Sequence, residues 1–120
     1  MTSSFELMFW LIVSHMVADF WAQSDALAQM KNRHRPTNPP PGQTLQSIWP
    51  YALTAHATMH GAGVALVTGS VGLGCLEIIC HWIIDFGKCE NWYGIHVDQA
   101  MHAGCKILWW ILVLGILREP

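Results

Sequence analysis

The sequence has little charge. Asp, Glu, Lys and Arg make up 12% of its 120 residues, and hydrophobic residues make up 52%. An ordinary globular domain carries about 25% charged residues. A chain with so few charged residues cannot form the charged, hydrated surface of an ordinary soluble domain. We therefore expect much of its surface to face an apolar solvent. The length suits one domain, and we predict a single membrane domain over residues 1–120.

The sequence also lacks the signatures of several other protein classes. The net charge is −2, and no basic stretch with interleaved aromatic residues is present, which argues against a nucleic-acid partner. The four cysteines show no CxxC spacing, so neither a zinc knuckle nor a dithiol redox centre is indicated. The first residues, MTSSFELMFW, have no basic region and carry Glu6, which is atypical of a cleaved secretory signal.

Four apolar runs are present, and they predict helices over about 5–23, 50–68, 72–88 and 96–117. Each run is near the ~20 residues that cross a bilayer. We therefore predict an all-α fold, a four-helix up-and-down transmembrane bundle. The polar segment over about 24–49 contains Pro36 and the run Pro39 to Pro41, so we expect an extended linker without a core of its own. Pro50 is expected in the first turn of the second helix.

The basic residues predict an orientation. Lys31, Arg33 and Arg35 lie in the long linker, and Lys88 precedes the second short connection. In a four-helix topology these two connections lie on one side, and the positive-inside tendency makes that side cytoplasmic. We expect a protein of the cytoplasmic (inner) membrane with both termini outside. Arg118, at the outer end, argues in the opposite direction.

Each predicted helix carries a pair of histidine or aspartate residues spaced by four. Residues at i and i+4 share one helix face, so every helix presents one polar face. At 1.5 Å per residue, the up-and-down topology puts all four pairs within roughly 5–15 Å of the cytoplasmic ends. The pairs are His15 and Asp19, His56 and His60, His81 and Asp85, and Asp98 and His102.

These pairs predict a metal centre. Uncompensated imidazoles and carboxylates are costly in a membrane, and three aspartates would repel one another. Imidazole with carboxylate suits zinc, manganese or iron, and helix bundles build two-metal sites from ligands at this spacing. We expect all eight residues to hold one or two divalent ions, with zinc as the first choice of metal. Two ions would bring the net charge of a ligand set with three carboxylates near neutral. Two alternatives stay open: His60 as a merely packed or supporting residue, and a metal-free His–Asp proton relay.

Polar residues also flank the pairs at the same spacing. Glu77 lies four before the histidine of the third helix, and Lys106 lies four after that of the fourth. Antiparallel helices place them at similar depth, so we predict an ion pair. The alternative is that Glu77 is a general base for a metal-bound water. Gln23, four after Asp19, is expected to hydrogen-bond a ligand or substrate near the mouth, or to be an interfacial amide.

Four strings, HMVADFWAQ, LTAHATMH, HWIIDFGK and DQAMH, together resemble a family of small integral membrane proteins of bacteria and their phages. The family pattern is HxxxDFxxQ, a helical histidine, HxxxDxxK and DQxxH, and the family is similar to membrane-bound metal-dependent hydrolases. The resemblance implies roles for the matching positions, which are His15, Asp19, Gln23, His56, His81, Asp85, Lys88, Asp98, Gln99 and His102.

Three functions are compatible with these features. The first is a metal-dependent hydrolase at the cytoplasmic membrane face, which cleaves a phosphoester or lipid-like substrate with metal-activated water. Lys31, Arg33, Arg35 and Lys88 would hold an anionic headgroup or only set the topology. The second is a metal-ion or proton transporter, although the apolar outer halves of the first and last helices argue for a one-sided cavity. The third is a phage membrane factor whose metal only stabilises the bundle.

Overall fold

The structure of the chain, a computed structural model, describes residues 2–35 and 41–117. Every regular element in these residues is helical, which confirms the all-α class. Pro36, Pro39, Pro40 and Arg118, which entered the predictions for the linker and the orientation, lie outside the described residues. The elements are α1 (Ser4–Met16), the π-helical turn η1 (Val17–Trp21), α2 (Asp25–Met30), α3 (Leu45–Thr68), α4 (Val71–Cys89), α5 (Ile95–Leu112) and the π-helical turn η2 (Val113–Leu117).

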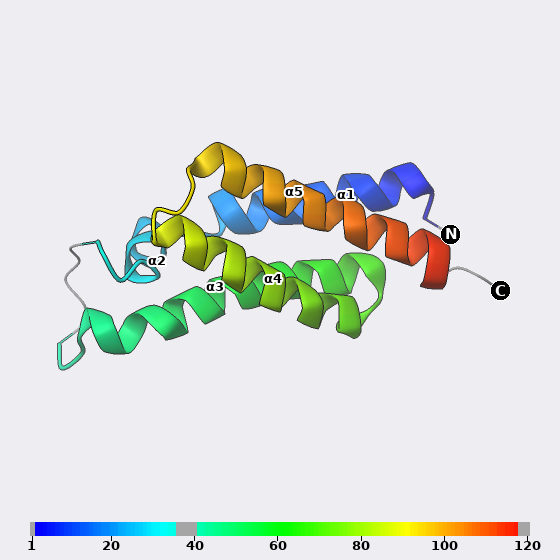
Figure 1. The fold of residues 1–120 in the computed structure, drawn as a ribbon. Coiled ribbons are helices and arrows are strands. Elements are labelled where there is room, and N and C mark those ends of the chain that lie inside the picture. The colour runs from blue at the N-terminus through cyan, green and yellow to red at the C-terminus, as the bar shows by residue number, and fades with distance from the viewer. Residues whose placement is uncertain (1, 36–40, 118–120) are drawn as a thin grey trace.

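The four long helices form an elongated bundle of 53 × 26 × 21 Å. Successive long helices run in opposite directions, with α1 and α5 along one side and α3 and α4 along the other (Figure 1). The short helix α2 lies at the end of the bundle that is remote from both termini (Figure 1). The up-and-down arrangement of four long helices is therefore present.

The start of α3 corrects the prediction for the second helix. The helix begins at Leu45, and Pro50 lies in its second turn instead of its first. The hydroxyl of Thr44 accepts a hydrogen bond from the Ser47 amide, and Ser47 in turn accepts one from the Thr44 amide. This reciprocal capping satisfies amide groups that a helix end leaves free, and it starts the helix earlier.

The predicted linker over 24–49 is likewise not extended throughout. It contains α2, which begins where the Ser24 hydroxyl accepts a hydrogen bond from the Leu27 amide. The extended prediction rested on the prolines, whereas local bonds from side chain to backbone decide the segments on either side of them.

The interior of the bundle is divided along its length. The half near the termini is an apolar core, and the other half holds buried polar and charged groups. The outside of the bundle carries many exposed large apolar side chains. Trp21 and Leu66, for example, are each 84% exposed. The apolar core consists of Leu7, Leu11, Val64, Leu73, Trp109 and Val113.

Among the described residues, one helical stretch is long and apolar enough to cross a membrane. It is Ile95–Ile116, with 22 residues and a mean hydropathy of 1.3. By this criterion the predicted four membrane-crossing helices are not supported, since only one qualifies. The polar residues that the sequence places on the helices lower their hydropathy: α3, for example, carries His56 and His60.

Two glycines let α3 and α4 approach closely. A Cβ added at Gly74 would lie 2.7 Å from the carbonyl oxygen of Gly61 and 2.8 Å from the Cβ of Ala65. Small residues at such crossings allow two helix backbones to come together. The crossing therefore sets the spacing between the histidines of α3 and the polar face of α4.

We expect Gly74→Ala to destabilise the protein by about 1–3 kcal/mol, because the clash is with backbone and cannot be relieved by a rotamer change. Thermal unfolding in detergent measures the effect. Gly104→Ala is the matched control in α5, since an added Cβ there meets nothing within 4 Å. The control should unfold at the same or a slightly higher temperature, and equal behaviour of the two variants would refute the close crossing.

Candidate metal centre

All eight histidine and aspartate residues predicted as ligands come together inside the bundle. None of them is more than 7% exposed. They reach the centre from α1 with its π-helical continuation and from α3, α4 and α5, so each of the four long helices contributes one pair. The residues are His15, Asp19, His56, His60, His81, Asp85, Asp98 and His102.

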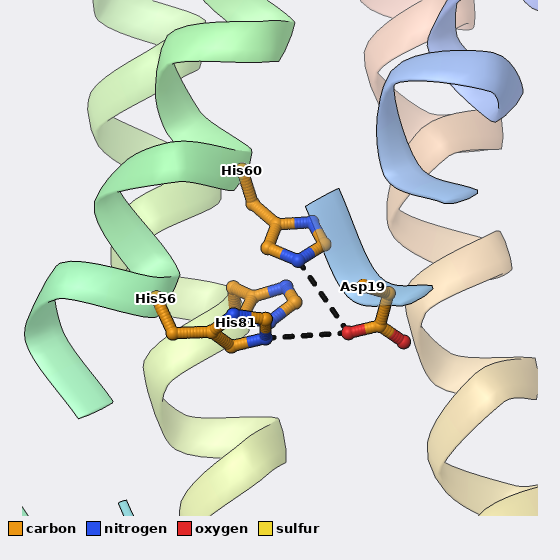
Figure 2. Close-up of side chains that lie close together, drawn as sticks. All are labelled: Asp19, His56, His60 and His81. Carbon is orange, nitrogen blue, oxygen red and sulfur yellow. Dashed lines mark hydrogen bonds and ion pairs between the residues drawn. The ribbon is translucent and has the colours of Figure 1, made fainter. Parts of the chain in front are cut away.

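Four of these residues form a first ligand set, shown in Figure 2: Asp19, His56, His60 and His81. One possible ligand atom from each lies within 4.8 Å of the others. Nε2 of His56 lies 3.2 Å from Oδ1 of Asp19, and Nε2 of His60 lies 3.5 Å from the same oxygen. The set therefore joins three helical segments around one carboxylate oxygen.

A second ligand set consists of Asp85, Asp98 and His102, again with ligand atoms within 4.8 Å of one another. Nε2 of His102 lies 3.2 Å from Oδ1 of Asp85 and 3.4 Å from Oδ1 of Asp98. The two sets share no residue, but a third group of possible ligands, His15, His81 and His102, overlaps both of them. The ring of His81 lies between those of His60 and His102, with centroid distances of 3.6 Å and 4.2 Å, so the sets are neighbours.

The π-helical turn η1 positions Asp19. The prediction treated 5–23 as one regular helix, whereas the α-helix ends at Met16 and a π-helical turn continues to Trp21. Such turns occur often at functional sites because they re-aim a side chain. The carboxylate of Asp19 lies closer to His56 of α3 than to His15 on its own helix, at 3.2 Å against 3.8 Å.

Buried polar atoms without hydrogen-bond partners are concentrated here. Among the described residues there are nine, and eight of them belong to the predicted ligands. His60 and His81 have no partner at either ring nitrogen. Each such atom costs about 1–3 kcal/mol, so native proteins contain few of them. The eight are seven imidazole nitrogens and one carboxylate oxygen, which are atom types that bind zinc, manganese or iron.

Gln99 connects the two ligand sets. Its Nε2 donates to Oδ2 of Asp19 at 2.7 Å and to Oδ2 of Asp98 at 3.2 Å, and its Oε1 lies 3.1 Å from Nε2 of His15. An amide can do this because it offers donors and an acceptor together. Reasoning from residue spacing gave Gln99 no role, and only the family pattern DQxxH contained it.

Lys31 also belongs to the site, although it was predicted to lie at the mouth. Its ammonium donates to Oδ2 of Asp85 at 2.5 Å, and its side chain is 7% exposed. It follows α2, so the linker inserts a cation beside the second ligand set. Lys88 approaches the same set from the rim, with Nζ 3.7 Å from Oδ2 of Asp98.

The predicted pair of Glu77 and Lys106 is confirmed. Lys106 donates to Oε1 of Glu77 at 2.5 Å, and the indole nitrogen of Trp109 donates to Oε2, also at 2.5 Å. Nδ1 of His81 lies 3.6 Å from Oε1. Glu77 is fully buried and both of its oxygens are engaged, which favours a supporting role beneath His81 over that of a general base.

A cavity of about 370 Å³ lies beside the centre, and we call it the basic vestibule. It is lined by three cations and, among the described residues, by no carboxylate. Of the residues predicted to hold a headgroup, Lys31, Arg35 and Lys88 line it and Arg33 does not. The lining residues are Gln23, Ala28, Lys31, Asn32, His34, Arg35, Lys88, Cys89, Asn91, Tyr93, Gly94 and Ile95.

Arg33 instead fastens the linker to the end of α4. Its Nε and Nη2 donate to the two oxygens of Glu90 at 2.7 Å and 3.0 Å, and its guanidinium lies 5.5 Å from the centre of the Phe86 ring. Hydrogen bonds from Arg33 and then His34 lower the pKa of Glu90, and the pair raises the pKa of Arg33. This clamp holds the segment that carries Lys31 over the centre.

Gln23 lies on the wall of the vestibule and not among the ligands. Its Nε2 donates to the backbone oxygen of Asp19 at 3.1 Å. Its Oε1 is buried and has no hydrogen-bond partner among the described residues. The predicted bond to a ligand is thus made to the backbone of that ligand, and one acceptor stays available.

Comparison with known proteins gives a family and no individual relative. No curated protein and no solved structure matches the chain. The model of DUF3307, described as a protein of unknown function, matches residues 7–117. That stretch includes every candidate ligand, Lys31 and the whole vestibule. The chain belongs to the DUF3307 family.

Proposed function

We propose that this protein is a metal-dependent hydrolase that works at a membrane face on a phosphoester or lipid-like substrate. One observation carries the proposal: two non-overlapping ligand sets, buried side by side, adjoin a basic cavity. A structural metal needs only a closed ligand cage, whereas a hydrolytic centre needs access for its substrate. The vestibule adjoins the centre through Lys31 and Lys88, which line it and lie against Asp85 and Asp98, so a substrate would enter from that side.

The ligand sets assign the residues that would hold two ions. The first ion would be held by Asp19, His56, His60 and His81, and the second by Asp85, Asp98 and His102, with His15 at their junction. When bound, such ions polarise the substrate and lower the pKa of water. The chain supports the ligands from outside: Gln99 orients Asp19 and Asp98, and Glu77 lies beneath His81.

We place this centre within a bilayer. Exposed large apolar side chains are found on all four long helices, among them Trp10, Leu66, Ile83 and Ile107. Soluble monomers rarely expose contiguous apolar patches above a few hundred Å². With 24 residues, α3 is about 36 Å long and can cross a core of about 30 Å. The four helices would cross together with their ligands turned inward, the vestibule at the cytoplasmic face of the inner membrane, and both termini outside.

The interior argues against transport. A pathway for ions or protons needs polar groups that continue across the bilayer. Beyond the pair of Glu77 and Lys106, the bundle interior is filled by the apolar core around Leu7, Leu11 and Trp109. The polar chamber therefore has one open side, as a hydrolase requires. A phage membrane factor with a purely structural metal is separated from a hydrolase by the next experiment.

Removal of metal is expected to abolish hydrolysis reversibly. Elemental analysis of detergent-purified protein should find two divalent ions per chain, zinc first, with manganese or iron as alternatives. Dialysis against a chelator should end turnover of a chromogenic phosphate ester, and the metal should restore it. Circular dichroism is the control, because loss of a structural metal unfolds the bundle. Protein without stoichiometric metal, or metal-loaded protein with no turnover of any ester tested, would refute the proposal.

A further inference from the structure

The vestibule has the charge and the size of a site for a small anion. Lys31, Arg35 and Lys88 line it, which are three of the six lysines and arginines in the chain. Arg35 is exposed and forms no ion pair within residues 2–35 and 41–117. A free guanidinium can bind a phosphate through two parallel hydrogen bonds. The volume of about 370 Å³ falls in the range of small-molecule pockets.

Lys31 connects the vestibule to the ligand sets. It lines the cavity, and its ammonium touches Asp85 at the same time. An anion bound between Lys31, Arg35 and Lys88 would therefore lie next to the second ligand set. A phosphate group held there is delivered to the place where the proposed metals act.

Gln23 adds a second requirement for the ligand. Its Nε2 donates to the backbone oxygen of Asp19, which fixes the orientation of the amide because a carbonyl accepts only from NH₂. Oε1 is then a buried acceptor on the wall of the cavity, and no donor for it is found among the residues that the structure describes. A fully deprotonated phosphate monoester has no proton to donate to this oxygen, whereas a hydroxyl has one.

We propose that the vestibule is a binding subsite for a phosphate monoester that also carries a hydroxyl group. Lys31, Arg35 and Lys88 bind the phosphate, and Gln23 accepts from the hydroxyl. Polyol phosphates have this chemistry, both free in solution and as lipid headgroups. That the bound ligand is a substrate rests on the proposed function. Binding itself can be tested without any turnover.

Binding of inorganic phosphate and of glycerol phosphate tests the subsite. Titration calorimetry on detergent-purified protein, at constant ionic strength, should give a tighter dissociation constant for glycerol phosphate. Arg35→Gln should weaken both ligands by about tenfold, as for loss of one charge-assisted bond, and Arg35→Lys should weaken them less. Gln23→Met should weaken glycerol phosphate more than inorganic phosphate, which has no alcohol hydroxyl. The control is Ser4→Glu, which changes net charge equally at the opposite end of the bundle and should leave both affinities unchanged.

Two further arms complete the experiment. Nanodiscs with lysophosphatidic acid, which has a phosphate monoester and a free hydroxyl, are compared with phosphatidylcholine nanodiscs to distinguish a lipid source from a soluble one. Binding of either phosphate source supports the subsite. Repeating the titrations after chelation separates the two proposals. Binding that still depends on Arg35 in the chelated protein keeps the subsite, whereas absence of turnover in the metal-loaded protein removes only the hydrolase. Affinities that are equal in the Arg35→Gln, Arg35→Glu and unmodified proteins would overturn the subsite.

Discussion

Replacing Asp85 with asparagine is expected to strip divalent metal from the purified protein and to abolish its hydrolytic activity. Oδ1 of Asp85 lies 3.2 Å from Nε2 of His102, and Oδ2 lies 3.5 Å from Nε2 of His56, so this carboxylate faces both ligand sets. Loss of an outer partner of a metal ligand typically costs about 10–100-fold in affinity or activity. Loss of a proposed ligand itself should exceed that range. The effect is measured as the number of metal ions per chain and as kcat/KM.

The control for this variant is Asp25→Asn, an exposed aspartate at the start of α2 that lies outside both ligand sets. It should retain metal and activity. Because Asp85→Asn also leaves the buried ammonium of Lys31 without its carboxylate, the double variant with Lys31→Met removes that effect. Full metal content and unchanged turnover in both Asp85 variants would show that Asp85 is not a ligand.

That the four pairs of histidine and aspartate residues meet inside the bundle could be predicted, because this depends only on helical spacing and on the order of the helices. Spacing by four puts two residues on one helix face, and the up-and-down order puts the four faces at one depth. The helix ends were less predictable, since the side chains of Ser24 and Thr44 cap helices inside a segment that its prolines suggested was extended. The π-helical turn at Asp19 has no signal in a pattern of apolar residues.

Contacts between residues that are far apart in the chain could not be predicted from the sequence. Lys31 and Asp85 are 54 residues apart, and Arg33 and Glu90 are 57 apart. Charge counting predicted only that these cations share one side of the membrane. Which of them enters the centre, which lines the cavity and which clamps the linker depends on how residues 31–35 fold back over α4. Glu77 and Lys106 were predictable, by contrast, because each extends a helical face already identified.

The second large effect is expected at that buried pair. Lys106→Met would leave the Glu77 carboxylate buried, with Trp109 as its one remaining hydrogen-bond donor among the described residues. Removing one partner of a buried ion pair typically costs about 3–5 kcal/mol, whereas replacing both partners is often close to neutral. The double variant Glu77→Gln/Lys106→Met should therefore recover most of the lost stability, since glutamine still accepts from the indole. Denaturant unfolding in detergent measures this cycle.

The same cycle decides the role of Glu77. If Glu77 only supports the ring of His81, the stable double variant loses no more than the roughly 10–100-fold in activity typical of an outer partner. If Glu77 is the general base, the double variant is stable and inactive, because glutamine cannot take a proton. Unchanged stability of Lys106→Met alone would contradict the buried pair itself. Stability thus reports on the pair and turnover reports on the base, so the two roles give different outcomes in one set of proteins.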